Sequence, residues 1–240
     1  KGGHTMESQK IKDIEELQKI AKKIRKGIIE EVYSSQSGHP GGSLSVIDIL
    51  TAIYEMDVDF NSNPRSKVVL SKGHAVPAQY AELCSKGIIK ESELGTFRTI
   101  NSRLQGHPYT GTIPEVDATT GLLGQGLSIA VGMAIAERHM ASVFNKEGYP
   151  VVDHYTYALG GDGCMMEGIS SEAFSLAGTL KLSKLIIFYD SNRISIEGST
   201  DIAFTENVQK RMEAFGFQTI TVEDGNNLEE IGKAIEAAKA

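Results

Sequence analysis

Hydrophobic positions recur with helical spacing near the start of the chain. Over residues 11–32 the apolar side chains follow a period of about 3.6 residues, which predicts an amphipathic helix. The members of this stripe are Ile14, Leu17, Ile20, Ala21, Ile24, Ile28 and Val32. A break rich in glycine and proline, SGHPGG, separates it from a second predicted helix over residues 44–54.

Farther along, short apolar runs alternate with helical patterns. The runs predict strands over residues 67–71 (KVVLS), 154–159 (HYTYAL), 185–190 (LIIFYD) and 217–222 (FQTITV). Helices are predicted over residues 77–86, 127–144, 167–180, 206–215 and 228–239. Because strands that alternate with long helices indicate βαβ units, we predict an α/β fold. Its core would be a doubly wound, mostly parallel sheet with helices on both faces.

Composition narrows the possible classes of protein. With 240 residues, 40% of them hydrophobic and 23% charged, the chain suits one large globular domain or two small ones. The opening KGGHTM is typical of an expression-tag remnant, so the domain is expected over residues 7–240. No internal repeat or low-complexity linker divides that range.

Charge and cysteine content exclude several partners. The net charge is −7, and the one basic run, KKIRK, lies within the first helical pattern, so no nucleic-acid surface is expected. We see no apolar stretch near the length of about 18 residues that a membrane span requires, and no signal peptide. Cys84 and Cys164 form no disulfide framework or metal motif. A cytoplasmic protein without membrane contact is expected.

A Gly-Asp-Gly sequence follows the second predicted strand. Asp162 lies between Gly161 and Gly163, and Asn192 comes thirty residues later, after the next strand. In parallel βαβ units both side chains would emerge at the carboxyl edge of the sheet, where ligands bind. Carboxylate, amide and backbone oxygens suit Mg²⁺ or Ca²⁺, whereas Zn²⁺ prefers Cys and His. The alternative is that Asp162 and Asn192 are turn residues, a common role for both types.

Three of the six histidines lie in loops next to glycine. They are His39 in SGHPG, His74 in SKGHA and His107 in QGHP. A lone histidine is usually structural, but three in the same context suggest a shared polar pocket that can move protons near neutral pH. His139 and His154 fall in a predicted helix and a predicted strand and are better interpreted as structural.

The loop TTGLLGQG is also rich in glycine. Gly124 and Gly126 could begin a dinucleotide-binding GxGxxG motif, but Ile129 replaces the third glycine and no predicted strand precedes the loop. The dinucleotide interpretation therefore fails its structural context.

Taken together, these motifs resemble those of a known family. GDG followed about thirty residues later by Asn resembles the diphosphate-binding motif of thiamine-diphosphate enzymes. The longer strings GDGCMMEGISSEAFSLAGTLKL and YDSNRISIEG resemble the transketolases, and the resemblance extends over nearly the whole chain. It implies that Asp162, Asn192 and the carbonyl of Ile194 hold Mg²⁺ on the diphosphate, with Ca²⁺ as a substitute. Gly161 and Gly163 would pack against the same group.

The resemblance also implies roles for the loops. His39 and His107 would contact the hydroxyls of the donor sugar and assist proton transfer, and His74 would lie between substrate and diphosphate. Backbone contacts to thiamine diphosphate would come from Gly121, Leu122 and Leu123, with Leu123 against the aminopyrimidine.

Glu167 is expected beside the cofactor site. It would not be a metal ligand but would belong to a buried carboxylate cluster that links the two active sites of a dimer. The alternative is that it is only a favourable acid in the first turn of a helix, and both can hold.

What the family has and this chain lacks suggests an assembly. Transketolases carry a pyrimidine-binding domain, which supplies the glutamate that activates the cofactor, and a third domain; neither fits in 240 residues. The resemblance thus implies half of an enzyme of carbohydrate metabolism, which transfers a two-carbon ketol unit from a ketose phosphate to an aldose phosphate. It would be inactive without a C-terminal, pyrimidine-binding partner, and dimerisation would give a heterotetramer. Both a split subunit and a piece of a full-length enzyme fit this resemblance.

Two other functions remain open from the sequence. The chain could be half of another thiamine-diphosphate enzyme, such as a deoxyxylulose-phosphate synthase, a phosphoketolase or a 2-oxoacid dehydrogenase component. It could also be a non-catalytic module that retains the cofactor fold, although Asp162, Asn192 and the loop histidines argue against this.

Overall fold

A computed structural model describes residues 13–196 and 198–240. The predicted tag remnant, residues 1–6, and the first two residues of the first predicted helix lie outside the described residues. The first helix, α1, runs over Ile14–Ser35 and carries the predicted apolar stripe on its buried face.

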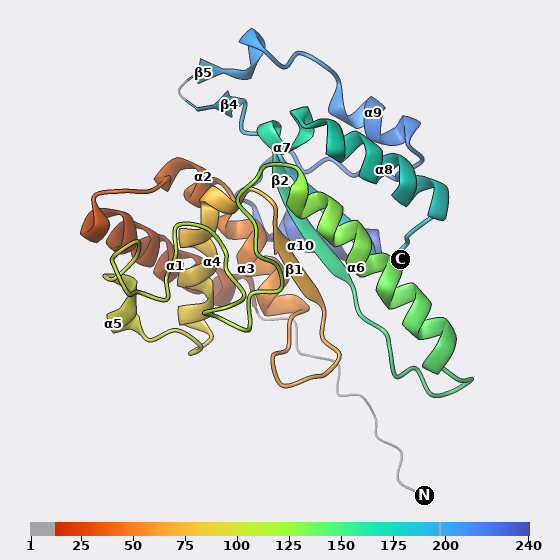
Figure 1. Ribbon diagram of the computed structural model, residues 1–240, viewed down its shortest axis with the longest axis horizontal. Helices are drawn as coiled ribbons and strands as arrows, with labels where there is room; N and C mark the ends of the chain where they lie inside the picture. The colour runs from red at the N-terminus through yellow and green to blue at the C-terminus, as the bar shows by residue number, and fades with distance from the viewer. Residues whose placement is uncertain (1–12, 197) are drawn as a thin grey trace, which may run out of the picture.

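Three parallel strands form the sheet at the centre of the molecule (Figure 1). They are β1 (Lys67–Leu70), β2 (Thr156–Gly161) and β3 (Leu185–Asp190), in the order β1-β2-β3. Gly161 at the end of β2 pairs with Asp190 at the end of β3, so both strands finish at the same level. The parallel sheet predicted from the sequence is confirmed.

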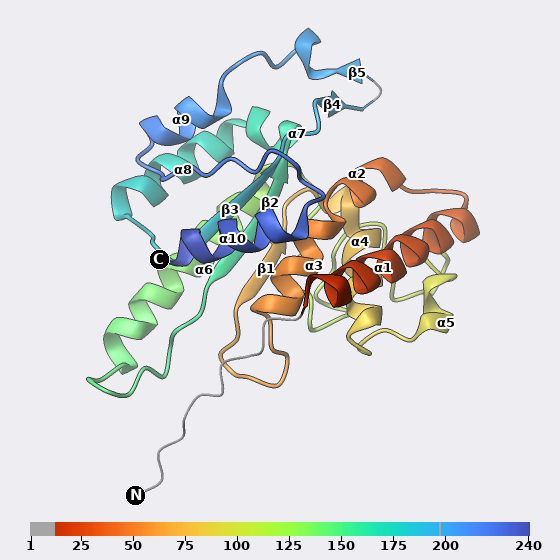
Figure 2. The ribbon, with the colours of Figure 1, turned by 180° about the vertical axis from the view of Figure 1, so that it is seen from behind.

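Two hydrophobic cores lie on opposite faces of this sheet, because successive side chains of a strand point to opposite faces. Val68 and Leu70 of β1 belong to one core and Val69 to the other. The first core packs against α1, α3 (Ile47–Met56), α4 (Val76–Ser85) and α10 (Leu228–Lys239). The second packs against α6 (Gln125–Phe144), α8 (Gly168–Leu180) and α9 (Val208–Ala214). Figure 2 shows α10, α3 and α1 covering one face, which confirms the predicted α/β fold.

Several short elements were not predicted. The glycine- and proline-rich break contains a helix, α2 (Pro40–Ser45), and Val46 separates it from α3, so the helix predicted over residues 44–54 is divided. The other short elements are η1 (Gly73–Ala75), α5 (Glu91–Leu94), α7 (Asp162–Met166), β4 (Ile194–Ser195), β5 (Gly198–Ser199) and η2 (Thr200–Ile202).

The strand predicted over residues 217–222 is wrong. The side chains do alternate, since Phe217 and Thr219 are half-buried while Gln218 and Ile220 are exposed. However, this segment pairs with no strand among the described residues, and the backbone N–H of Phe217 donates instead to Met212 O at 3.1 Å. Alternating apolar and polar side chains indicate that one face of a segment is buried, whereas a strand also needs a hydrogen-bonding partner for its backbone.

Helix α6 corrects the expectation that no apolar stretch of this chain has the length of a membrane span. By length and composition it is apolar enough to cross a membrane, the one such helix in the described part of the chain. In the fold it packs against β1, β2 and α8. Its buried Glu137 accepts a hydrogen bond from Lys184 Nζ at 3.0 Å. These contacts are typical of a helix that covers a sheet.

Candidate functional site

The carboxyl ends of the three strands bring polar side chains together. Lys72 follows β1, Asp162 follows β2 and starts α7, and Asp190 ends β3. Lys72 Nζ donates to Asp190 Oδ2 at 2.5 Å, which joins the ends of the two outer strands across β2. In Figure 1 β2 leads directly into α7 at this edge, where β4 and β5 also lie. The edge is the position expected for a ligand in an open parallel sheet.

Asp162 has one bonded and one free carboxylate oxygen. The residue is only 4% exposed, and Oδ1 accepts a hydrogen bond from the Tyr189 hydroxyl at 2.5 Å. Oδ2 is buried and has no hydrogen-bond partner. Because an unsatisfied buried carboxylate oxygen is costly, this atom is suited to a ligand that supplies positive charge.

Asn192, which follows the end of β3, is held in one orientation by two hydrogen bonds. Its Nδ2 donates to Asp190 Oδ2 at 3.1 Å, and its Oδ1 accepts from the backbone N–H of Ile194 at 3.0 Å. Ile194 begins β4 and is 62% exposed. The predicted metal ligands are thus a carboxylate, an amide oxygen and a backbone carbonyl, the hard oxygen donors that Mg²⁺ and Ca²⁺ prefer. Among residues 13–196 and 198–240, no group of three or more His, Cys, Asp or Glu side chains is placed so that it could hold a metal ion.

The two glycines around Asp162 differ in how much room they have. A Cβ at Gly163 would lie 2.9 Å from Leu123 Cδ1, so a larger residue in this turn would have to displace the end of the Leu123 side chain. A Cβ at Gly161 would meet nothing closer than 3.8 Å. Gly161 is therefore not demanded by packing within this chain.

The loop of residues 121–124 packs against the histidine loops. Gly121 has a φ of +152°, and a Cβ there would lie 3.3 Å from the ring of His107. Gly121 N is also 2.9 Å from the position of a Cβ on Gly73, which precedes His74. Leu122 is 77% exposed and Leu123 is half-buried, so this loop presents backbone and apolar surface.

The three predicted histidines do gather in space. His39 lies at the N-terminus of α2, His74 lies in η1, and their ring centroids are 5.3 Å apart. Burial lowers the pKa of all three side chains. For His74 the nearby Lys72 ammonium adds to burial, and the pKa falls to about 4. His74 is therefore neutral at pH 7 and can both donate and accept a hydrogen bond.

Arg98 is a functional candidate that the sequence analysis missed. Its Nη1 donates to Ser37 Oγ at 2.8 Å, two residues before His39, and its guanidinium lies against Gly106, which precedes His107. After burial, the charge of Arg98 is the next cause that lowers the pKa of His39 and His107. A hollow of about 360 Å³ lies beside it, lined by Gln105, Gly106, His107, Pro108, Tyr109, Thr119 and Thr120.

Lys72, Asp190, Ser45 and Tyr189 were also missed. Ser45 Oγ donates to Asp190 Oδ1 at 2.7 Å, so α2 is tied to the end of β3. A possible signal was present in the sequence: a lysine and an aspartate each lie at the carboxyl end of a predicted strand. Their pairing over 118 positions could not be read from either motif.

The other predicted polar residues lie as follows. Glu167 is exposed at the start of α8, so its expected burial in a carboxylate cluster would need a second chain. A Cβ at Gly124 would lie 2.7 Å from Glu167 Cβ, which places this acid against the loop of residues 121–124. His139 is exposed on α6, and His154 is half-buried just before β2.

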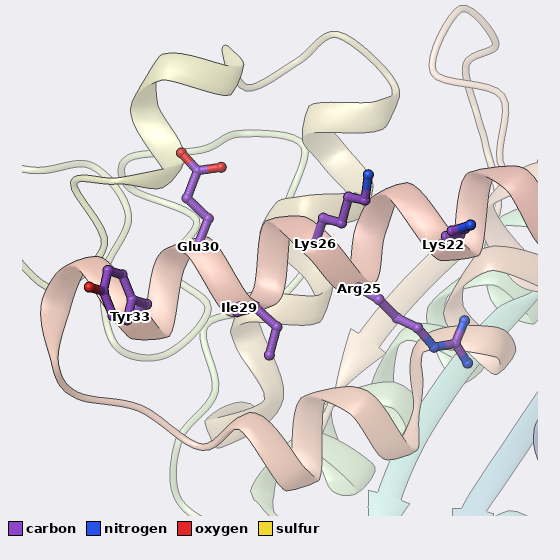
Figure 3. A pocket seen from close by; sticks show the side chains of 6 residues that line it. All are labelled: Lys22, Arg25, Lys26, Ile29, Glu30 and Tyr33. Atoms are coloured by element: carbon purple, nitrogen blue, oxygen red, sulfur yellow. The ribbon is translucent and has the colours of Figure 1, made fainter.

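A larger hollow of about 540 Å³ lies along α1 (Figure 3). Its lining residues are Lys22, Arg25, Lys26, Ile29, Glu30 and Tyr33. The Arg25 guanidinium pairs with Asp48, with Nη1 3.2 Å from Oδ1, and is not free to bind a ligand. None of the predicted site residues lines this hollow, so size alone does not locate the site.

Comparisons with known proteins agree with the geometry. The family described as "Transketolase, thiamine diphosphate binding domain" matches residues 16–240. The chain is 46% identical over 223 residues to a transketolase of Geobacillus stearothermophilus, covering 90% of this chain and 33% of that protein. It is 47% identical, over the same number of residues, to a transketolase of Halalkalibacterium halodurans, covering 90% of this chain and 34% of that protein.

Solved structures give the same family. A transketolase from Leishmania mexicana superposes with a TM-score of 0.89 at 43% identity, covering 93% of this chain and 34% of that one. A Pichia stipitis transketolase in complex with sedoheptulose-7-phosphate matches with a TM-score of 0.89 at 40% identity, again covering 93% and 34%. The chain thus spans about a third of the length of these relatives. It belongs to the family of transketolase thiamine-diphosphate-binding domains.

Proposed function

We propose that this chain is the diphosphate-binding half of a transketolase. In the complete enzyme it would help transfer a two-carbon ketol unit from a ketose phosphate to an aldose phosphate. The observation that carries this proposal is the buried, partnerless Oδ2 of Asp162 near the oriented amide of Asn192. Further support comes from the related Pichia stipitis structures, which were solved with sedoheptulose-7-phosphate and with fructose-6-phosphate.

The residues present fit thiamine diphosphate and a divalent cation. Asp162, Asn192 and the carbonyl of Ile194 would hold Mg²⁺, or Ca²⁺ in its place, on the diphosphate. The bound cofactor supplies the carbanion chemistry of the reaction. Gly163 and the loop of residues 121–124 would give it a close-fitting wall.

The three histidines would bind the hydroxyls of the sugar and transfer protons. With lowered pKa values, His39, His74 and His107 are neutral at pH 7, so each can accept a proton from a hydroxyl and donate another hydrogen bond. Their loops converge from α2, η1 and the segment before residue 121, so a polyol could meet all three rings.

The remaining parts of the enzyme would come from outside this chain. A pyrimidine-binding domain would activate the cofactor, either as a separate C-terminal subunit or as a further part of the same polypeptide. We propose that two copies of each half assemble into a heterotetramer in the split case. The coverage of about a third of each relative supports a missing partner of this kind.

Substitution of the proposed metal ligand tests the proposal. Asp162→Ala should abolish Mg²⁺-dependent binding of thiamine diphosphate, because it removes the one carboxylate ligand. Calorimetric titration of the complete protein with cofactor, with and without Mg²⁺, measures this. Asp224→Ala, at an exposed aspartate after residue 222, is the matched control and should leave the affinity unchanged. Unchanged affinity in Asp162→Ala would remove the metal assignment.

A further inference from the structure

Asp190 accepts hydrogen bonds from three parts of the fold. Lys72 Nζ, after β1, donates to Oδ2 at 2.5 Å, and Ser45 Oγ, in α2, donates to Oδ1 at 2.7 Å. Asn192 Nδ2, in the loop after β3, donates to Oδ2 at 3.1 Å. The side chains of Lys72 and Asp190 are only 2% and 10% exposed. Asp190 is thus a largely buried carboxylate that has a donor at each oxygen.

The charge of Asp190 is already compensated. A buried carboxylate needs a cation or several donors, and Asp190 has both. Asp162, in contrast, keeps one buried oxygen without any donor. The two aspartates therefore differ in function: Asp162 can accept a metal ion, whereas Asp190 is committed to protein groups.

Two hydrogen bonds, one to Asp190 and one from Ile194, set which way the Asn192 amide faces. An amide can present either its oxygen or its NH₂ group to a neighbour, and only the oxygen can bind a cation. Asp190 holds Nδ2, so Oδ1 faces the other way, where it accepts from the N–H of Ile194 at 3.0 Å. Without an acceptor at residue 190, the bond from the N–H of Ile194 would be left alone to oppose rotation of Nδ2 toward the cation.

We propose that Asp190, neutralised by Lys72, is a positioning residue that fixes the amide of Asn192 with its oxygen toward the divalent cation. This inference rests on the proposed function, since it presumes that Asn192 is a metal ligand. Through Ser45 the same carboxylate also ties the metal loop to α2, at whose N-terminus His39 lies. The ligand loop and the histidine loop thus share one buried anchor.

Two double variants separate the hydrogen bond from the charge. Lys72→Met with Asp190→Asn, and Lys72→Met with Asp190→Leu, both remove the ion pair, and both place a side chain branched at Cγ at residue 190. The first keeps an acceptor for Asn192 Nδ2 and the second does not. We expect Mg²⁺ affinity near the wild-type value in the first. In the second we expect a loss of about 10- to 100-fold, the usual effect of removing a group that orients a metal ligand.

The affinity is measured by calorimetric titration of the complete protein with Mg²⁺ in the presence of thiamine diphosphate. Asp57→Leu is the control, because Asp57 is a similar acceptor for Ser66, Tyr157 and Lys239 that lies outside the site. It should leave Mg²⁺ affinity unchanged. Thermal unfolding checks that each variant is folded, and Asp190→Ala replaces Asp190→Leu if the leucine variant does not fold.

A rescue variant gives an independent readout. Asn192→Asp presents an oxygen in either rotamer, so it should restore Mg²⁺ affinity in the Lys72→Met/Asp190→Leu background. Equal Mg²⁺ affinity in the two double variants would overturn the positioning role. If wild type and Asp162→Ala bind the cofactor equally, the proposed metal site itself fails, and the inference fails with it. A loss in Asp162→Ala without a difference between the double variants refutes only the inference.

Discussion

Asp162 directly follows β2 and Asp190 ends the neighbouring β3, yet their surroundings give them different properties. Asp162 has a single donor, the Tyr189 hydroxyl, whereas Asp190 has a lysine, a serine and an asparagine. At the residue scale, chemistry therefore follows from the number of donors that the fold brings to each oxygen, rather than from residue type. The surroundings also set the pKa values of the histidines, which are lowered first by burial and then by nearby cations.

Replacement of Arg98 tests the charge acting on the histidine pair. Arg98→Gln should raise the pKa of His39 and His107, because it removes the positive charge that follows burial among the causes of their lowered values. NMR titration of the histidine ring protons measures each pKa. His154 is the internal control, because its pKa is set by burial and by Glu137, Lys67 and Lys184 instead. Unchanged titration of both histidines would contradict this account of Arg98.

His74 should make the fold less stable in mild acid. Its pKa is about 4 in the folded chain and 6.5 in the unfolded one, so the unfolded state binds its proton first as pH falls. The contribution is fully present above pH 6.5 and is lost down to pH 4. Because His74 is half-buried, we reduce the full effect for solvent screening and expect about 2 kcal/mol.

His74→Asn should remove this part of the pH dependence, because asparagine does not titrate in this range. Urea unfolding at pH 7 and pH 4.5 compares the free energy of unfolding of the two proteins. The loss between the two pH values should be smaller in the variant. An equal loss in both would show that His74 titrates normally in the folded chain.

At the scale of elements, close backbone contacts hold the site loops against the helices. Helix α6 begins beside Ser71, and the backbone N–H of Leu127 donates to Ser71 Oγ at 3.2 Å. This approach is possible because residue 126 is a glycine, where a Cβ would lie 2.6 Å from Ser71 Cα. The start of α6 and the end of β1, which leads to Lys72 and His74, are therefore packed without space between them.

Two glycines of α6 provide a matched test of this close backbone packing. Gly126→Ala should destabilise the fold by about 1–3 kcal/mol, because backbone atoms must move to admit the methyl group. Gly132→Ala, where a Cβ meets nothing within 4 Å, should stabilise it by about 0.5–1 kcal/mol through better helix propensity. Urea unfolding measures both. The packing argument fails if the two substitutions change stability in the same direction.

Sequence patterns predicted the long elements and missed those that depend on tertiary contacts. The apolar period of α1 and the runs of β1, β2 and β3 are local properties, so they could be read directly. The helix α2 was missed because glycine and proline usually mark a break, although Pro40 at its start is a favoured first helical residue. Residues 217–222 had the burial of a strand without a strand to pair with.

In the candidate site, too, local motifs could be predicted from the sequence, whereas tertiary contacts could not. Gly161, Asp162 and Asn192 could be found because the motif lies after a predicted strand, where βαβ geometry places ligands. The pairing of Lys72 with Asp190 could not be found, because it depends on the order β1-β2-β3 and on the register of strands far apart in sequence. Arg98 was missed for a similar reason, since its loop carries no motif and its importance comes from contact with Ser37 and Gly106.

At the scale of the whole molecule, this domain has a surface that suits a partner. Leu122, Ile194, Ile196 and Ile202 are 77%, 62%, 97% and 84% exposed. Leu122 lies in the loop of residues 121–124, and the three isoleucines lie in the segment from β4 to η2 that follows Asn192. Large apolar side chains gathered around a site are more typical of an interface than of a solvated surface.

Reconstitution tests the assembly. The chain alone should show no ketol transfer between a ketose phosphate and an aldose phosphate, because in the proposed function a pyrimidine-binding domain activates the cofactor. Addition of a pyrimidine-binding C-terminal partner should produce transfer, followed by a coupled assay of the aldose product. Release of CO₂ from pyruvate by the pair would identify a synthase instead. Cofactor binding without turnover with any candidate partner would indicate a non-catalytic module.

The pairing of Gly161 with Asp190 has a consequence for folding. Tyr189 and Asp190 are consecutive residues of β3 and point to opposite faces, where one reaches Asp162 and the other reaches Lys72. A slip of β3 by one residue would exchange the two faces and separate both pairs. Only the correct register would then offer the diphosphate and its metal a complete set of oxygens. Cofactor binding would thus stabilise the chain with the correct strand register relative to any chain with a shifted register.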